Sequence, residues 1–152
     1  MLRKHNFIKM LWTALVALLL AACSSQDGSL KISPDAISGR WYNQAQVDQG
    51  QQIFADNCAA CHGPAGQGGE NWRVANAEGI YPAPPLNGSA HAWHHPLALL
   101  KQTINDGGVA LGGSMPAWQD RLTDDQQMAT IAALQYTWSD DIYNAWKQIN
   151  AR

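Results

Sequence analysis

The stretch "NCAACHG" at residues 57–63 constrains this chain more than any other feature. Cys58 and Cys61 stand three positions apart, and His62 follows directly. Residues three apart on a helical turn face the same way, so both thiols can reach one flat group while the imidazole points at its centre. The chain has 3 cysteines, and the third, Cys23, stands near the N-terminus. The pair and the histidine therefore have to be explained together.

The Cys-x-x-Cys-His pattern is the attachment signature of haem c, in which each thiol adds to a vinyl group and the imidazole coordinates the iron. Three alternatives stay open. A redox dithiol of the thioredoxin type belongs in a βαβ context, of which the sequence shows no sign. A structural disulfide, conceivable in an oxidising compartment, leaves His62 unexplained. A zinc site needs four ligands, of which the motif supplies three at most, and the fourth would be His91, His94 or His95.

The first 22 residues have the pattern of a bacterial lipoprotein signal peptide. Three basic residues precede the apolar run Leu11–Leu20, which is shorter than the ~20 residues of a membrane-spanning helix. "LAAC" at residues 20–23 resembles a lipobox, which implies cleavage before Cys23 and lipid attachment to it. Ser24 follows where inner-membrane retention signals carry Asp, which favours the outer membrane. The alternative is an uncleaved N-terminal anchor.

The mature chain is predicted to have two parts, a lipidated N-terminus with a flexible tether at residues 23–42 and one domain at residues 43–152. Residues 24–39 are rich in Ser, Gly, Asp and Pro, which is typical of a tether. Cleavage removes three of the 10 Lys and Arg residues and none of the 12 Asp and Glu residues. The negative charge that results argues against nucleic-acid binding. It favours approach to a basic patch on a protein partner.

Capping signals predict the two main helices. A capping-box pattern opens one helix at Asn43 and another at Thr123, and we expect them to run to Asn57 and Trp138. Gly50 lies on the core side of the first helix. Because glycine inside a helix costs about 1 kcal/mol against alanine, its presence predicts that another backbone comes close.

The rest of the chain predicts short helices and long loops. Residues 96–107 and 140–150 have helical patterns, whereas residues 63–88 are rich in Gly and Pro and irregular. Long irregular segments in a compact domain are usually functional or disordered. No strand pattern appears, so the predicted class is all-α with three to four short helices. Leu, Ile, Val and Phe are few for such a chain, which indicates that a cofactor fills the middle.

Across about residues 43–138 the chain resembles the class I monohaem cytochromes c. The matching features are the attachment motif, the four-residue spacing of Gly50, Phe54 and Cys58, "PPL" at residues 84–86 and "GGSMPAW" at residues 112–118. The resemblance implies a cytochrome c-like fold wrapped around one covalent haem c.

The resemblance also implies roles for the residues of the attachment motif. Cys58 and Cys61 would carry the thioethers, and His62 would be the proximal iron ligand through Nε2. The backbone carbonyl of Pro84, with Pro85 as the rival, would accept the Nδ1–H of His62. Such a bond fixes the tautomer and raises the basicity of the ligand.

Met115 would be the distal iron ligand through its sulfur, and Trp118 would pack near the haem edge or propionates. A methionine is more often a flexible core filler than a ligand. Met115, however, stands in a glycine-rich loop directly before Pro116, where packing explains it poorly. The rival ligand is a histidine of "AHAWHH" at residues 90–95.

One departure from the family concerns the closing helix. The family usually carries an aromatic residue where this chain has Ala133. Tyr136, three positions on, is expected to pack against Gly50 and Phe54 instead.

The histidine cluster has no role in the resemblance. His94 and His95 are expected to cap the helix that begins at Pro96, since local capping by polar side chains is common, and His91 is expected to be solvated. A contact with a haem propionate or a transient metal site, for example for copper, is the alternative.

With His62 and Met115 both on the iron, no coordination position is open. The expected function is therefore one-electron transfer between Fe(II) and Fe(III) by an electron carrier, without catalysis of its own. We expect an exported protein, held by its lipid at the periplasmic side of a bacterial membrane, that exchanges electrons with a donor and an acceptor protein. The alternatives are a haem subunit of a larger oxidoreductase and a haem-based sensor in which Met115 is displaced by a ligand.

Overall fold

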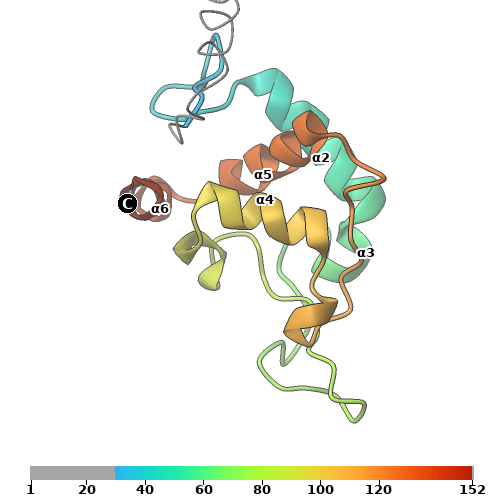
Figure 1. Ribbon diagram of the computed structural model, residues 1–152. Helices are drawn as coiled ribbons and strands as arrows, with labels where there is room; N and C mark the ends of the chain where they lie inside the picture. The colour runs from blue at the N-terminus through green and yellow to red at the C-terminus, as the bar shows by residue number, and fades with distance from the viewer. Residues whose placement is uncertain (1–29, 152) are drawn as a thin grey trace, which may run out of the picture. The chain divides into compact units, whose positions relative to one another are not determined.

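The computed structural model describes residues 30–151, and the regular elements in this part of the chain are helices, as the sequence predicts (Figure 1). Their one β-type pairing is an isolated bridge between Tyr81 and Gly113. No helix in this part of the chain is long and apolar enough to span a membrane. The predicted signal peptide and Cys23 lie outside the described residues. The elements are α2 (Gln44–Asn57), α3 (Ala59–His62), η2 (His91–His94), α4 (Leu97–Asp106), η3 (Val109–Leu111), α5 (Asp124–Tyr136) and α6 (Asp140–Asn150).

Both predicted capping boxes are confirmed. The Asn43 side chain accepts the Gln46 N–H, and the Gln46 side chain accepts the Asn43 N–H, each at 3.0 Å. Thr123 and Gln126 form the same reciprocal pair at the start of α5. These bonds satisfy backbone N–H groups that have no partner inside the helix, which is why both helices begin at the expected residues.

Helices α2 and α5 pack against each other more extensively than any other pair of elements (Figure 1). They cross at Gly50, where an added Cβ would collide with the carbonyl oxygen of Ala129 and lie 2.9 Å from the Ala133 Cβ. The predicted close approach is confirmed. The expectation that Tyr136 packs here is wrong, because its side chain is 47% exposed. At the crossing Gly50 meets Ala129 and Ala133 instead.

Trp41 and Tyr42 are packed on the helices, whereas residues 32–40 are exposed or half-buried. Trp41 and Tyr42 are 2% and 0% exposed. The indole N–H of Trp41 donates to Gln135 Oε1 at 2.7 Å, and its backbone N–H donates to the Tyr143 hydroxyl at 3.2 Å. The last two residues of the predicted tether thus pack on the helices. Burying two large aromatic rings outweighs the turn-rich composition of the segment.

Helix α4 is capped from the far end of the chain. The N–H of Leu97 donates to the Asn150 side-chain oxygen at 2.7 Å. Pro96 stands at the N-cap position, and no side chain of the local sequence caps the helix there. The expectation that His94 and His95 cap α4 is therefore wrong, since an amide from the last residue of α6 already satisfies the N–H that they would have served.

Candidate haem site

Cys58, Cys61 and His62 are carried by one helical turn that continues α2. Cys58 keeps a helical backbone conformation and donates its N–H to Phe54 O at 2.9 Å. The N–H groups of Cys61 and His62 both donate to Cys58 O, at 3.1 and 2.9 Å. The backbone bonds therefore fix the relative places of the two thiols and the imidazole.

The two thiols are not bonded to each other. Burial raises the pKa of Cys58 to about 11, and the neighbouring Cys61 adds to the rise. A redox-active dithiol has a lowered pKa, because the thiolate is the reactive species. The structure therefore gives no support to a thioredoxin-like dithiol.

The imidazole of His62 is buried and has a defined orientation. Its Nδ1 lies 3.0 Å from the carbonyl oxygen of Pro84, so Pro84 and not Pro85 is the proline that faces this histidine. Burial lowers the pKa of His62, and the bond to Pro84 opposes the shift. The neutral form donates from Nδ1 and keeps a lone pair on Nε2, which is the form that binds metals.

The segment that contains Pro84 is held against the attachment turn by the loop after His62. The N–H of Gly68 donates to His62 O at 2.7 Å, and the N–H of Gly69 donates to Ala83 O at 2.8 Å. Gly68 has a φ of 76°, and an added Cβ would lie 2.7 Å from the Pro84 carbonyl carbon. Glycine is needed here for both its positive φ and its missing side chain. The result is a rigid support for the His62–Pro84 contact.

Met115 lies in a loop that folds back on the end of α4. Its carbonyl oxygen accepts the Gly108 N–H at 2.9 Å. Its half-buried side chain packs against a small apolar cluster made of Ile53, Trp118 and Leu122, with Ile104 also in contact. Trp118 is buried within this cluster. The ligand role of Met115 and the haem contact of Trp118 stay predictions.

The donor set fits a haem better than a bare metal ion. Within residues 30–151, no three His, Cys, Asp or Glu side chains stand where they could share a metal ion, so the zinc and copper alternatives gain no support. Two free thiols and a neutral imidazole on one turn, with Nδ1 already engaged by Pro84, match what covalent attachment and one axial ligand require.

The histidine cluster is organised by aromatic contacts. His91 stacks on Trp72 with ring centroids 5.4 Å apart, and its ring lies edge-on to His95 at 5.3 Å. Burial lowers the pKa of His95, and the neighbouring His91 and His94 add to the shift. The cluster stands apart from the attachment turn in sequence, and its contacts are with tryptophan rings.

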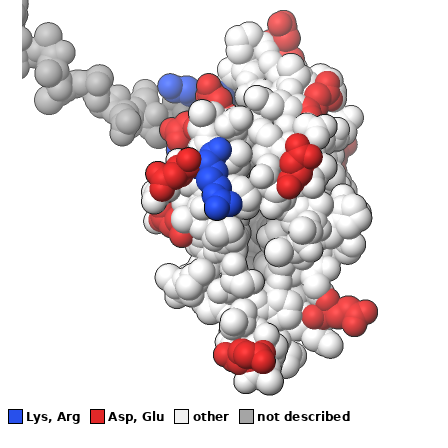
Figure 2. Space-filling model, turned by 90° about the vertical axis from the view of Figure 1, so that its right-hand side faces the viewer, with Lys and Arg blue, Asp and Glu red and all other residues white. Residues whose placement is uncertain are grey.

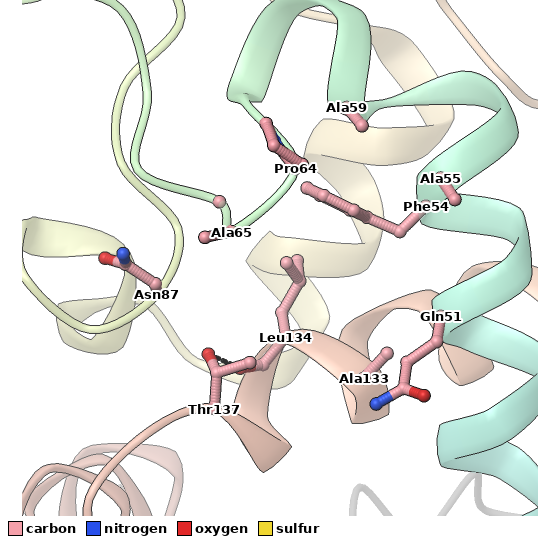
Figure 3. Close-up of a pocket in the computed structure, with 11 residues that line it drawn as sticks. Gln51, Phe54, Ala55, Ala59, Pro64, Ala65, Asn87, Ala133, Leu134 and Thr137 are labelled. Carbon is pink, nitrogen blue, oxygen red and sulfur yellow. Dashed lines mark hydrogen bonds between the residues drawn. The ribbon is translucent and has the colours of Figure 1, made fainter.

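An apolar cavity of about 470 Å³ lies beside the attachment turn and was not predicted (Figure 3). Phe54 and Leu134 reach into it, and Ala59 and Pro64 border it on the side of the turn (Figure 3). Ala133 also lines it. The sequence does contain a signal for the cavity, because Ala133 stands where the family usually has an aromatic residue.

This combination of fold and site is that of a c-type cytochrome. The chain belongs to the family described as cytochrome C oxidase, cbb3-type, subunit III, whose sequence model matches residues 45–133. The family supports a covalent haem c as the cofactor. The match leaves out residues 32–44, the last turn of α5 and all of α6.

Curated relatives are subunits of cbb3-type cytochrome c oxidases. Subunit CcoP of Azospirillum sp. (strain B510) is 34% identical over 99 residues, which cover 65% of this chain and 30% of the relative. Subunit CcoP of Cereibacter sphaeroides is 35% identical over 88 residues, covering 58% and 26%. Subunit FixP of Rhizobium meliloti (strain 1021) is 36% identical over 80 residues, covering 52% and 23%. The chain thus spans less than a third of these relatives. No solved structure matches it.

Proposed function

We propose that this chain is an electron carrier of the c type that holds one covalent haem c, with His62 and Met115 as its axial ligands. The observation that carries the proposal is the 3.0 Å contact between His62 Nδ1 and Pro84 O. His62 stands on the same turn as Cys58 and Cys61, and the contact leaves its Nε2 for the iron. The haem, when bound, supplies one-electron chemistry between Fe(II) and Fe(III).

On the proximal side the protein supplies attachment and a fixed proton. Cys58 and Cys61 hold the porphyrin through thioethers. His62 keeps a proton on Nδ1 and donates it to Pro84 O, which fixes the tautomer and makes Nε2 a stronger donor. Burial keeps the imidazole neutral by lowering its pKa. The proximal ligand is therefore ready without rearrangement.

On the distal side the protein supplies a thioether and a dry environment. Met115 sits against Ile53, Trp118 and Leu122, which shield it from water. A methionine ligand raises the reduction potential of a haem. Apolar surroundings act in the same direction, since they disfavour the extra charge of Fe(III). With both axial positions held by the protein, electron transfer rather than oxygen chemistry is the supported reaction.

The N-terminal sequence supports a membrane tether. We propose that residues 1–22 are removed, that Cys23 carries lipid, and that residues 23–31 link the lipid to a domain that starts near residue 32. This arrangement places the domain at the periplasmic side of a membrane, with Ser24 favouring the outer one. Acidic side chains outnumber basic ones on the face in Figure 2. A redox partner with a basic docking surface fits this charge.

A second candidate function is that of a haem subunit of a larger oxidoreductase. The relatives that carry this domain are subunits of cbb3-type oxidases, which favours the idea. Purification of the native chain in mild detergent separates the two. A carrier elutes alone, whereas a subunit elutes with a catalytic partner at a fixed ratio.

The test of the proposed function is the covalent haem itself. Protein expressed with a periplasmic maturation system should give the pyridine haemochrome spectrum of haem c and a mass increase of one haem. Cys58→Ala with Cys61→Ala should abolish both. Met115→Ala should remove the methionine–iron absorption band of the oxidised protein. Ready carbon monoxide binding to the reduced wild type would favour the sensor alternative instead.

A further inference from the structure

Trp138 is a buried tryptophan that makes a specific hydrogen bond to the proline segment. It stands between α5 and α6 and is 4% exposed. Its indole N–H donates to the carbonyl oxygen of Leu86 at 2.8 Å. Trp138 lies beyond residue 133, where the match to the family ends. The donor of the bond therefore lies outside the matched part, and its acceptor Leu86 lies inside it.

The acceptor of this bond is joined to the candidate haem ligand by a stiff piece of backbone. Leu86 is two residues from Pro84, whose carbonyl faces His62 Nδ1 at 3.0 Å. Between the two carbonyls Pro85 fixes one φ angle, and the bond from the Leu86 N–H to Gly66 O at 2.7 Å restrains the peptide that joins Pro85 to Leu86. A shift of the Leu86 carbonyl therefore moves the Pro84 carbonyl with it.

The proline segment is held from two sides. On one side Gly66 O accepts the Leu86 N–H at 2.7 Å and the Asn87 N–H at 3.2 Å. On the other side stands Trp138. Its ring lies directly over Gly88, where an added Cβ would be 3.3 Å from the Trp138 Cδ1 atom. Gly66 thus bonds to Leu86 and Asn87, whereas Trp138 bonds to Leu86 and lies against Gly88.

Trp138 has its own support from α6. Its ring meets that of Trp146 edge to face, with centroids 6.3 Å apart. The Trp146 indole donates in turn to His95 O at 3.0 Å. Trp146 therefore bonds to a different segment from the one that faces His62, although the two rings touch.

We propose that Trp138 is a positioning residue for the proximal ligand, because its hydrogen bond to Leu86 fixes the Pro84 carbonyl against His62 Nδ1. The inference rests on the proposed function, in which His62 binds the haem iron. A well-placed carbonyl strengthens the Nδ1–H bond and makes the imidazole a better donor. A better donor favours Fe(III), so Trp138 lowers the reduction potential of this protein.

The test compares Trp138→Phe with Trp146→Phe in the haem-loaded protein. Each variant keeps an aromatic ring and loses one indole N–H donor. In the reduced, diamagnetic state, NMR should show the His62 Nδ1 proton exchanging about fivefold faster in Trp138→Phe, the change that one lost hydrogen bond of ~1 kcal/mol gives. The midpoint potential of this variant should rise. Trp146→Phe should leave both quantities at the wild-type values.

Equal effects in the two variants, or no effect in Trp138→Phe, would overturn the proposal. If Trp138→Phe does not fold, replacing Trp138 with benzothienylalanine keeps the ring shape and removes only the N–H, and the same comparison applies. Haem loading of the wild type distinguishes a failure of the proposed function from a failure of the role proposed for Trp138. A wild type without haem ends the proposed function, whereas a loaded wild type with no difference between the variants ends only the role of Trp138.

Discussion

The part of the chain that matches the family and the segments that flank it are built in different ways. Where α2 and α5 cross, the contact is made by Gly50, Ala129 and Ala133, and the backbones nearly touch. In the flanks, large aromatic rings are buried almost completely, with Trp146 at 0% exposure. The core thus relies on close backbone approach and the flanks on buried aromatic area.

The difference explains how a domain with so few large aliphatic residues can be stable. In the part that matches the family, the interior is filled by small residues and by the haem that we propose. The flanks add a continuous row of aromatic contacts from Trp41 through Tyr42 and Tyr143 to Trp146, with neighbouring centroids 5.2 to 6.2 Å apart. Aromatic pairs at such distances stabilise beyond the area that they bury.

The largest expected effect is the loss of a flank ring. Trp146→Ala should lower the free energy of unfolding by about 3–5 kcal/mol, the usual effect of deleting a buried Trp. It also removes the hydrogen bond to His95 O. Denaturation of the haem-loaded protein with guanidinium measures the change. Leu99→Ala on the exposed side of α4 is the control and should change stability by ~0.5 kcal/mol or less. Similar losses in both variants would mean that the flanks add nothing special.

The next largest effect tests the helix crossing. Gly50→Ala should destabilise by about 1–3 kcal/mol, because the new methyl group collides with backbone and one helix has to move. In an open helix the same change would stabilise by about 1 kcal/mol. Gln49→Ala, on the exposed side of α2, is the matched control. Equal melting temperatures for the two variants would show that the helices do not approach as closely as the structure has them.

Features set by residues close together in sequence were predicted better than contacts between residues far apart in sequence. The capping boxes and the close approach at Gly50 follow from short sequence patterns, whereas the His62–Pro84 contact follows from the resemblance to the class I cytochromes c. The burial of Trp41 could not be predicted, because its partners Gln135 and Tyr143 are about a hundred residues away. The sequence around Trp41 has the composition of a turn-rich linker. The residues that bind Trp41 belong to α5 and α6, at the other end of the chain.

The two wrong helix expectations have different origins. Spacing from the family aromatic predicts Tyr136 at the crossing, yet Gly50 meets Ala129 and Ala133 there. Local capping predicts nearby histidines at the start of α4, yet Asn150 caps it from the other end of the domain. Only in the second case is the residue that takes the position distant in sequence. The ligand roles of His62 and Met115 stay predictions, which the spectra proposed above will test.

A smaller effect is expected from the cap of α4. Asn150→Ala should destabilise by ~1 kcal/mol, the usual loss when a side-chain cap is removed. The backbone amide of Leu97 should exchange faster, since it loses its acceptor. His94→Ala serves as the control and should leave this amide unchanged. Faster exchange in the histidine variant alone would restore the local capping that the sequence suggested.

The smallest expected change in stability at neutral pH comes from replacing two buried tyrosines of the flanks, which should respond in opposite directions. The Tyr42 hydroxyl is buried beside the Arg40 side chain without a hydrogen bond of ordinary geometry, whereas the Tyr143 hydroxyl accepts the Trp41 N–H. Tyr42→Phe should therefore stabilise by up to ~1 kcal/mol, because it removes an unpaired polar group, and Tyr143→Phe should lose about 1 kcal/mol.

Tyr42→Phe should also differ from the wild type in its stability at alkaline pH. Burial raises the pKa of Tyr42 above its ordinary value of 10.0, with the Arg40 charge opposing the shift. A phenol that stays neutral when folded contributes its full stability below the pKa of the unfolded chain, and this contribution falls as the pH rises past about 10. Tyr42→Phe should flatten that decline, measured as melting temperature between about pH 8 and pH 11. An unchanged decline would mean that the aromatic row opens to solvent before the domain unfolds, and that the flanks are looser than the core they cover.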